Sequence, residues 1–257
     1  MTPTIASLYR YPVKGLSPEP LTEATLKAGE YFPGDRLFAI ENGPSGFDSA
    51  APAHQPKVKF LMLMRNERLA GLRTRYDAAA KTLTIEDASR PPVVADVTTR
   101  EGRLAVEAFF RRFMPDELRG PPKVLAAPAG FRFTDNSRGF VSFINLASVA
   151  AIEKLVGAPV NPLRFRANVY VTGLAAWHEF DLMDREFTLG NARLKVHKRI
   201  KRCAATNVDP DSAARDLAIP DTLMRTFGHM DCGVYAEVLA GGDIRIGSTL
   251  AENQPSP

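Results

Sequence analysis

The fold class of this chain is decided by the stretch Phe187-Thr188-Leu189-Gly190-Asn191-Ala192-Arg193-Leu194-Lys195-Val196. Two strand-like runs flank the pair Gly190-Asn191, and such a pair favours a tight two-residue turn. The stretch therefore predicts a β-hairpin. Similar short runs, bounded by glycine or proline, recur on both sides of it along the chain.

Short strands and a few helices make up the rest of the predicted structure. Strands are expected at residues 5–11, 21–26, 36–40, 72–76, 82–85, 168–172, 234–239 and 244–246. Apolar residues spaced three and four apart predict a helix over 104–113, and a second short helix is expected over 147–156. The fold class is therefore predicted to be β-dominated α+β, for which barrels or sandwiches are the natural architecture.

Proline and glycine also mark a division of the chain. Pro115 and the cluster Gly120-Pro121-Pro122 end the predicted helix. We expect a first domain over residues 1–120, a second over 121–252, and a tail at 253–257. A length of 257 residues is enough for two modest domains without disulfide bonds.

The composition excludes several classes of protein. Cys203 and Cys232 are the only cysteines, too few for a disulfide framework or a four-cysteine zinc or iron–sulfur site. The sequence has no run of about 18 apolar residues and no apolar leader, so we expect neither a membrane span nor a secretory signal. A cytoplasmic protein with reduced thiols is the resulting prediction. The basic–aromatic interleaving typical of nucleic-acid binding is also absent.

A basic segment precedes the first cysteine. Five of the eight residues from Lys195 to Arg202 are lysine or arginine, although the net charge of the chain is only +4. If a strand runs to Cys203, alternation places these side chains on one face: Lys195, His197, Arg199, Lys201 and Cys203. Nearby cations favour a thiolate, which suits a nucleophile or a soft-metal ligand. The alternative is a solvated strand edge whose charges discourage aggregation.

Other segments carry groups that suit anions. In Arg164-Phe165-Arg166-Ala167-Asn168 an extended backbone would point both arginines the same way, and guanidinium groups bind phosphate through paired hydrogen bonds. In Tyr11-Pro12-Val13-Lys14-Gly15 an ammonium and a backbone N–H can face an anion, and Gly34-Asp35-Arg36 adds another arginine. The alternatives are ordinary surface salt bridges for the first segment and a plain turn for the second.

The order of these segments resembles the MOSC family, named for the C-terminal domain of molybdenum-cofactor sulfurase. The resemblance rests on Tyr-Pro-Val-Lys at 11–14, Gly-Asp-Arg at 34–36, Arg-Phe-Arg-x-Asn at 164–168, Arg-Cys at 202–203 and Val-Asp-Pro-Asp at 208–211. More closely, the chain is similar to the two-part architecture of the mitochondrial amidoxime-reducing component and its bacterial relatives. This resemblance implies an N-terminal β-barrel domain packed against a MOSC β-barrel domain.

The resemblance also implies a role for each matching residue. Cys203 matches the cysteine whose thiolate ligates molybdenum, which makes it the metal ligand and the catalytic residue. The molybdenum cofactor, a molybdopterin, is expected to contact Lys14, Arg36, Ser137, Arg166, Asn168, Lys201, Arg202 and Cys203. The residue types agree, because molybdenum prefers a soft thiolate and the pterin phosphate attracts arginine and lysine. The chain departs from the family pattern at Gly15, Lys201 and Ala213.

The function implied is a molybdenum-cofactor-dependent oxidoreductase. Its substrates are expected to be small N-hydroxylated compounds, such as amidoximes and hydroxylamine derivatives, which lose an oxygen atom. Electrons are expected from a separate flavin, heme or iron–sulfur protein. The alternatives are a carrier of molybdenum cofactor, a carrier of sulfur on Cys203, and an anion-binding protein without redox chemistry. No nucleic-acid partner is expected, and Cys232 is expected to be a passive thiol near a turn.

Overall fold

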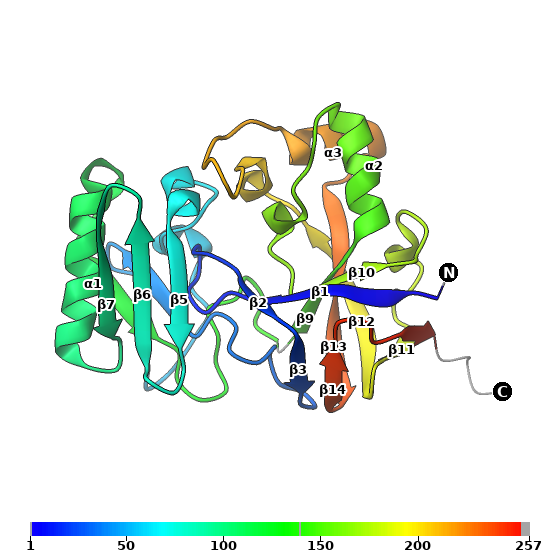
Figure 1. The fold of residues 1–257 in the computed structure, drawn as a ribbon, viewed down its shortest axis with the longest axis horizontal. Coiled ribbons are helices and arrows are strands. Elements are labelled where there is room, and N and C mark those ends of the chain that lie inside the picture. Colours follow the sequence, from blue (N-terminus) through cyan, green and yellow to red (C-terminus); the bar gives the residue numbers. More distant parts are fainter. Residues whose placement is uncertain (1, 139, 253–257) are drawn as a thin grey trace.

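The computed structural model describes residues 2–138 and 140–252, so the tail predicted at 253–257 lies outside the described residues. Figure 1 shows two bodies side by side, with the first and last described strands in the larger one. The large body contains an eight-stranded sheet, and the small body lies at the other end of the molecule. The fold class predicted from the sequence, β-dominated α+β, is confirmed.

The large body is organised around one mixed sheet. In spatial order its strands are β15 (Leu250–Glu252), β11 (Glu186–Leu189), β12 (Ala192–Lys201), β13 (Asp231–Ala240), β9 (Phe140–Asn145), β10 (Val169–Thr172), β1 (Thr4–Arg10) and β2 (Glu19–Leu21). A separate pair, β3 (Glu23–Leu26) and β14 (Gly242–Arg245), packs into the same core. The hairpin predicted from 187–196 is confirmed, because β11 and β12 pair antiparallel across Gly190-Asn191.

Two helices cover part of this sheet. α2 (Leu146–Val156) begins where the Asn145 side chain accepts a hydrogen bond from the Ala147 N–H, and it ends at Gly157 in the left-handed conformation. α3 (Ile219–Phe227) ends in the same way at Gly228. Their inner faces enclose an apolar cluster that contains Cys232. The helix predicted over 147–156 is therefore confirmed, whereas α3 was not predicted.

The small body combines short strands with one long amphipathic helix. Its strands are β4 (Phe38–Asn42), β5 (Arg73–Asp77), β6 (Thr82–Asp87), β7 (Arg90–Asp96) and β8 (Pro122–Ala126). The predicted hairpin at 72–85 is confirmed by the pairing of β5 with β6. α1 (Arg100–Phe113) buries Val106, Phe109 and Phe110 against β7 and β8. It starts four residues before the predicted helix because Thr99 caps the Gly102 N–H.

The strand pairing does not follow the division expected at residue 120. β1 pairs with β10, and β3 pairs with β14, so the first strands of the chain complete the sheet of the large body. β8, which follows residue 120, pairs with β4 in the small body. Sequence punctuation could not show these pairings, because the paired strands lie far apart in the chain.

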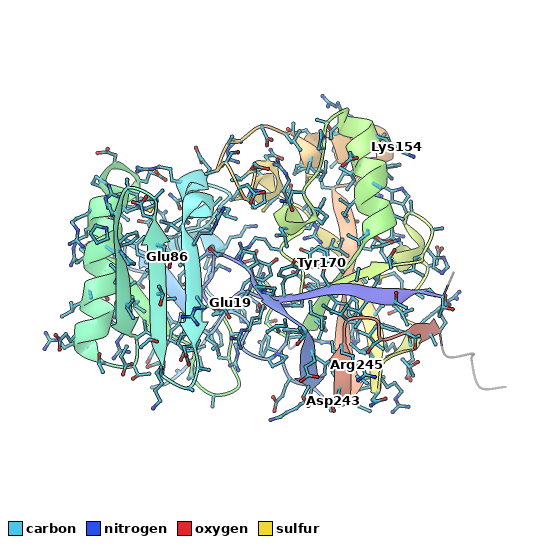
Figure 2. The ribbon with its side chains drawn as sticks, in the orientation of Figure 1. Glu19, Glu86, Lys154, Tyr170, Asp243 and Arg245 are labelled. Carbon is cyan, nitrogen blue, oxygen red and sulfur yellow. The ribbon has the colours of Figure 1, made fainter. Side chains whose placement is uncertain are left out.

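The Glu19 carboxylate links the two bodies. Glu19, at the start of β2, accepts a hydrogen bond from Arg10 at 2.7 Å and a second from the backbone N–H of Tyr76 in β5. Figure 2 places Glu19 at the junction of the bodies. Among the described residues, none of the helices is both long and apolar enough to cross a membrane.

Candidate functional site

A cavity of about 360 Å³ lies between the two bodies. Small-molecule sites in proteins commonly enclose about 300–1,000 Å³. Its lining is strongly basic. The basic residues are Lys14, Arg36, Lys57, Arg164, Arg166, Lys198, Arg199, Lys201 and Arg202, whereas the acidic ones are only Asp35 and Asp135. Nine basic side chains against two acidic ones favour an anionic ligand.

One wall of the cavity is the end of β12 and the residues that follow it. Every residue from Lys198 to Cys203 lines the cavity, whereas Lys195 and His197 do not. Register shifts after Val196 and after Arg199 interrupt the alternation of side chains. The prediction that Lys195, His197, Arg199, Lys201 and Cys203 share one face is therefore wrong. His197 instead pairs with Glu237 at 2.6 Å.

Cys203 presents a free, partly exposed thiol to the cavity. It lies just before a 3-10 turn, η6 (Ala204–Asn207), and its carbonyl accepts hydrogen bonds from the N–H and the Oγ1 of Thr206, both at 3.0 Å. These bonds fix the backbone and leave the Sγ available. Lys57, which comes from the small body, approaches the thiol. Burial acts to lower the pKa of Lys57, but Asp135 and Cys203 outweigh it and raise that pKa.

Asp135 forms a bridge between two lysines at this part of the cavity. Its carboxylate lies 2.5 Å from the Lys14 Nζ and 3.8 Å from the Lys57 Nζ, and Lys14 also donates to the Phe133 carbonyl at 3.0 Å. Burial would raise the pKa of Asp135, but Lys14 and Lys57 more than offset it and hold that pKa below its ordinary value. Asp135 is therefore a carboxylate that neutralises part of the lysine charge.

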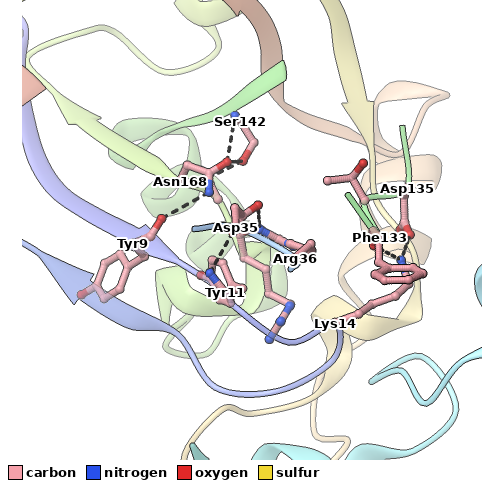
Figure 3. Close-up of polar contacts among 12 residues, drawn as sticks. Tyr9, Tyr11, Lys14, Asp35, Arg36, Phe133, Asp135, Ser142 and Asn168 are labelled. Atoms are coloured by element: carbon pink, nitrogen blue, oxygen red, sulfur yellow. Dashed lines mark hydrogen bonds and ion pairs between the residues drawn. The ribbon is translucent and has the colours of Figure 1, made fainter. Parts of the chain in front are cut away.

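A second group of charges gathers around Tyr11. The guanidinium carbons of Arg36 and Arg166 lie 4.5 and 4.3 Å from the centroid of its ring. Asp35 pairs with Arg36 at 2.5 Å and accepts a hydrogen bond from the Tyr11 N–H. Figure 3 shows Tyr11, Asp35 and Arg36 together, with the Lys14–Asp135 pair on the other side of the view.

Arg166 lines the cavity without an acidic partner among the described residues. Within residues 2–138 and 140–252 its guanidinium has no carboxylate within 4 Å and donates no hydrogen bond, and its Nη2 is buried. Burial, and then repulsion from Arg36, lowers the pKa of Arg166 to about 10. The Arg166 side chain is partly exposed, and its guanidinium stacks on the Tyr11 ring instead of pairing with a carboxylate. Arg166 therefore has donors available for an anion.

Arg164 and Arg166 do not point the same way, so the extended backbone expected for 164–168 is wrong. A 3-10 turn, η4 (Pro162–Phe165), precedes Arg166, whose φ is 52°. Arg164 turns instead to Asp216 and Asp209 at 2.7 and 2.9 Å. Arg164 forms salt bridges, as the alternative interpretation expected, but its side chain is buried and starts from a turn, not from the surface. The two arginines therefore serve different parts of the structure.

Two other predicted cofactor contacts are already engaged with the protein. Asn168 accepts from the Ser142 Oγ at 2.8 Å and donates to the Tyr9 carbonyl at 3.2 Å, which ties neighbouring strands together (Figure 3). Arg202 donates to the carbonyls of Cys232 and Phe165 at 2.7 and 2.9 Å, but its Nη2 has no partner in the described part of the chain.

Ser137 is not brought to the cavity. Its side chain is exposed, its carbonyl accepts a hydrogen bond from the Tyr31 hydroxyl, and the nearby lining residues are Thr134 and Asp135. The other predicted contacts, including Lys201, all line the cavity. Sequence reasoning missed Lys57 and the segment 62–64, because no local motif marks residues that only the tertiary fold brings to the site.

Arg215 connects residues 63–67 of the small body to Ala204 in the large body. Its guanidinium donates to the carbonyls of Leu63 and Met64 at 3.2 and 3.3 Å, to the Glu67 carboxylate at 3.0 Å, and to the carbonyl of Ala204 at 2.8 Å. Ala204 directly follows Cys203. The apolar segment 62–64 is therefore tied to the backbone next to Cys203.

Comparison with known proteins agrees with the two-part arrangement. The family model described as "MOSC domain" matches residues 132–251, and that described as "MOSC N-terminal beta barrel domain" matches residues 2–114. A segment of 122 residues is 29% identical to mitochondrial amidoxime reducing component 2 of Bos taurus, covering 43% of this chain. The match spans only 36% of that relative.

Two solved structures are also similar. The YUAD protein from Bacillus subtilis shares 12% sequence identity, with 99% of this chain and 98% of that chain covered, at a TM-score of 0.45. YiiM from Geobacillus stearothermophilus shares 22% identity over 44% of this chain and 54% of that chain, at a TM-score of 0.35.

Proposed function

Because the chain belongs to the MOSC family and carries that family's N-terminal beta barrel domain, we propose that it binds molybdenum cofactor and reduces N-hydroxylated compounds. The observation that carries the proposal is the combination of one free thiol and an uncompensated arginine in the same cavity. The substrate class is suggested by the name of the Bos taurus relative, an amidoxime reducing component.

The residues of the cavity fit this cofactor. Molybdopterin combines a metal that takes a soft thiolate with a phosphate that takes guanidinium groups. The described residues contain no cluster of three histidine, cysteine or acidic side chains. A metal bound at Cys203 therefore needs its other ligands from a cofactor, which is what a pterin dithiolene provides.

Different residues of the cavity would bind different parts of the cofactor. Cys203 would ligate the metal, while Arg166, Arg36 and Arg202 would bind the phosphate and the polar edge of the pterin. Lys14 and Asp135 lie between the two, where they fix the charge balance. When bound, the cofactor would supply the two-electron chemistry that removes oxygen from nitrogen.

The electrons must come from a reductant. We propose a separate flavin, heme or iron–sulfur protein as the donor, and a cytoplasmic compartment that keeps Cys203 reduced. The substrate would enter along the wall formed by residues 62–64 and meet the cavity beside Cys203.

The first experiment expresses the protein in a host that makes molybdenum cofactor. We expect bound molybdenum and pterin, and reduction of benzamidoxime to benzamidine with a chemical reductant. Cys203→Ser should lower the molybdenum content and reduce the turnover by about 100-fold or more, because the metal loses its protein ligand. Cys232→Ala, which removes the other thiol, is the matched control and should retain both.

The outcomes separate the alternatives. Wild-type turnover in Cys203→Ser would overturn the assignment of Cys203 as metal ligand. A protein that binds the cofactor, releases it readily and turns over no substrate would be a carrier. Expression without molybdenum in the competent host would leave an anion-binding protein.

A further inference from the structure

Three lysines around Cys203 are not explained by the phosphate site. Asp35 pairs with Arg36, and Asp209 and Asp216 pair with Arg164. Arg166 is proposed to bind the phosphate of the cofactor. The remaining lysines of the lining are Lys14, Lys57, Lys198 and Lys201, and of these only Lys14 has a carboxylate within hydrogen-bond distance. The cavity around the thiol therefore carries positive charge beyond that needed to bind the phosphate.

Lys57 interacts with the thiol from the small body. Its side chain is about a third exposed, at 34%, and its only acidic neighbour in the described chain is Asp135 at 3.8 Å, which is already bonded to Lys14 at 2.5 Å. One carboxylate thus serves two ammonium groups. The Lys57 Nζ keeps hydrogen-bonding capacity for an incoming anion.

Lys198 lines the same cavity from the large body. Its Nζ lies 5.7 Å from the centroid of the Tyr235 ring, and Tyr235 lines the same cavity. Neither Lys198 nor Lys201 has a carboxylate within 4 Å in the part of the chain that the structure describes. The two bodies therefore each place a lysine with free hydrogen-bonding capacity on the lining of the cavity that contains Cys203.

The wall next to these lysines is apolar. Met62, Leu63 and Met64 line the cavity from the small body, and Arg215 anchors their backbone. Methionine side chains adapt to flat apolar or aromatic groups. The space beside the thiol therefore combines an adaptable apolar wall with cations, which matches a ligand that has an apolar body and an anionic group.

We propose that Lys57 and Lys198 select N-hydroxylated substrates that carry a carboxylate, whose apolar body packs on residues 62–64. This inference rests on the proposed function, because it names the substrate class of the same site. The overall reaction is R–C(NH₂)=N–OH plus two electrons and two protons, giving R–C(NH₂)=NH and water. The N–O bond breaks, the nitrogen is reduced, and the carboxylate of R takes no part in the bond changes.

A matched pair of substrates tests the inference. 4-Carboxybenzamidoxime and its methyl ester have the same reacting group and differ in charge. We expect the cofactor-loaded wild-type protein to prefer the acid by about tenfold in kcat/KM, mainly through KM, since one charge–charge contact in a partly buried site has about this effect. The preference should fall as NaCl is raised from 0.05 to 0.5 M.

Variants assign the preference to the two lysines. Lys57→Gln and Lys198→Gln should each lower the acid-to-ester ratio about threefold, and the double variant should bring it near one, with rates divided by molybdenum content. Lys59→Gln is the matched control, because Lys59 lies on the same short 3-10 turn, Lys57–Lys59, but does not line the cavity. It should keep the wild-type ratio. A wild-type ratio of one, or an unchanged ratio in the double variant, would overturn the inference.

A binding measurement separates this inference from the proposed function. Calorimetry of the same holoprotein compares the products 4-carboxybenzamidine and its methyl ester, and needs no turnover. If neither amidoxime is reduced but the acid product still binds about tenfold more tightly, the proposed function fails and the carboxylate site stands. Equal binding of the two products would overturn the carboxylate site whatever the turnover.

Discussion

Two regions of the molecule each contain one cysteine and one arginine of interest, in opposite states. At the cavity, Cys203 has a partly exposed thiol and Arg166 has no acidic partner among the described residues. In the region formed by η4, η6 and the helices α2 and α3, Cys232 is fully buried, and Arg164, although it lines the cavity, makes four hydrogen bonds to Asp209, Asp216 and Asn207. The residue types are the same, so the surroundings alone separate them.

This comparison shows where the molecule keeps capacity to bind something else. Arg164 and Arg166 are two residues apart, but the left-handed backbone at Arg166 sends their side chains to different places. A paired buried charge holds the fold together, whereas an unpaired one weakens the fold and is retained for a ligand. Identical substitutions in the two regions should therefore have opposite effects.

The largest effect is expected from Arg164→Met. The Arg164 side chain is 2% exposed, and those of Asp209 and Asp216 are 20% and 44% exposed. Removing one partner of a buried ion pair costs about 3–5 kcal/mol, and we expect about 2–3 kcal/mol here because Asp216 remains partly hydrated. Chemical denaturation of the cofactor-free protein at pH 7 measures this loss in the free energy of unfolding.

Arg164→Lys is the control for that substitution. It keeps a positive charge but not the paired contacts with two carboxylates, so it should recover only part of the stability. A loss below about 0.5 kcal/mol in Arg164→Met would contradict the view that this region is held by the ion pairs.

Several elements of the large body show which parts of the fold could be predicted from the sequence. The hairpin over 187–196 was predictable because its turn chemistry is local. The start of η4 also had a local signal, Asn161 followed by Pro162, which is typical of a helix start. α3 had local signals as well, Pro220 in its first turn and Gly228 just after its end, but no helix was predicted there.

The division of the chain between the two bodies had no local signal in the sequence, and neither did some of the residues that line the cavity. β1 is bound to β10, about 160 residues away, and no periodicity in either strand specifies the other. Motif positions could nominate Cys203, Lys14, Arg36 and Arg166 as site residues, and the structure brings them to one cavity. Lys57 reaches the thiol only because the small body packs against the large one.

The next effect, of opposite sign, is expected from Arg166→Met. Burial lowers the pKa of Arg166 from an ordinary value of 12.5 to about 10, so the folded state holds this proton less tightly than the unfolded chain does. A shift of that size corresponds to about 3 kcal/mol of destabilisation at neutral pH. We expect the free energy of unfolding of cofactor-free Arg166→Met to exceed that of wild type by about 1–2 kcal/mol. The gain is smaller than about 3 kcal/mol because the contact with Tyr11 is lost. After expression in a host that makes the cofactor, the variant should contain less bound pterin.

The pH dependence of this gain is a separate test. Below pH 10 the wild-type protein carries the full penalty of the buried charge, and the penalty fades as the pH rises from about 10 towards 12.5. The stability difference between variant and wild type should therefore shrink between pH 9 and 11, as measured by urea denaturation. A variant that is less stable than wild type at pH 7 would break the comparison with Arg164.

The smallest effect is expected from Cys232→Ala, because it removes one buried sulfur from a region that can partly relax. The loss of stability should be about 1 kcal/mol, with the molybdenum content unchanged. Burial raises the pKa of Cys232 to about 12, so its thiol should resist modification at pH 8. A disulfide reagent should therefore titrate one thiol in the native cofactor-free protein and two after denaturation, and the native reaction should vanish in Cys203→Ser but persist in Cys232→Ala. Two reactive thiols in the native protein would show that the region under α2 and α3 opens to solvent, and the two cysteines would then differ in rate rather than in kind.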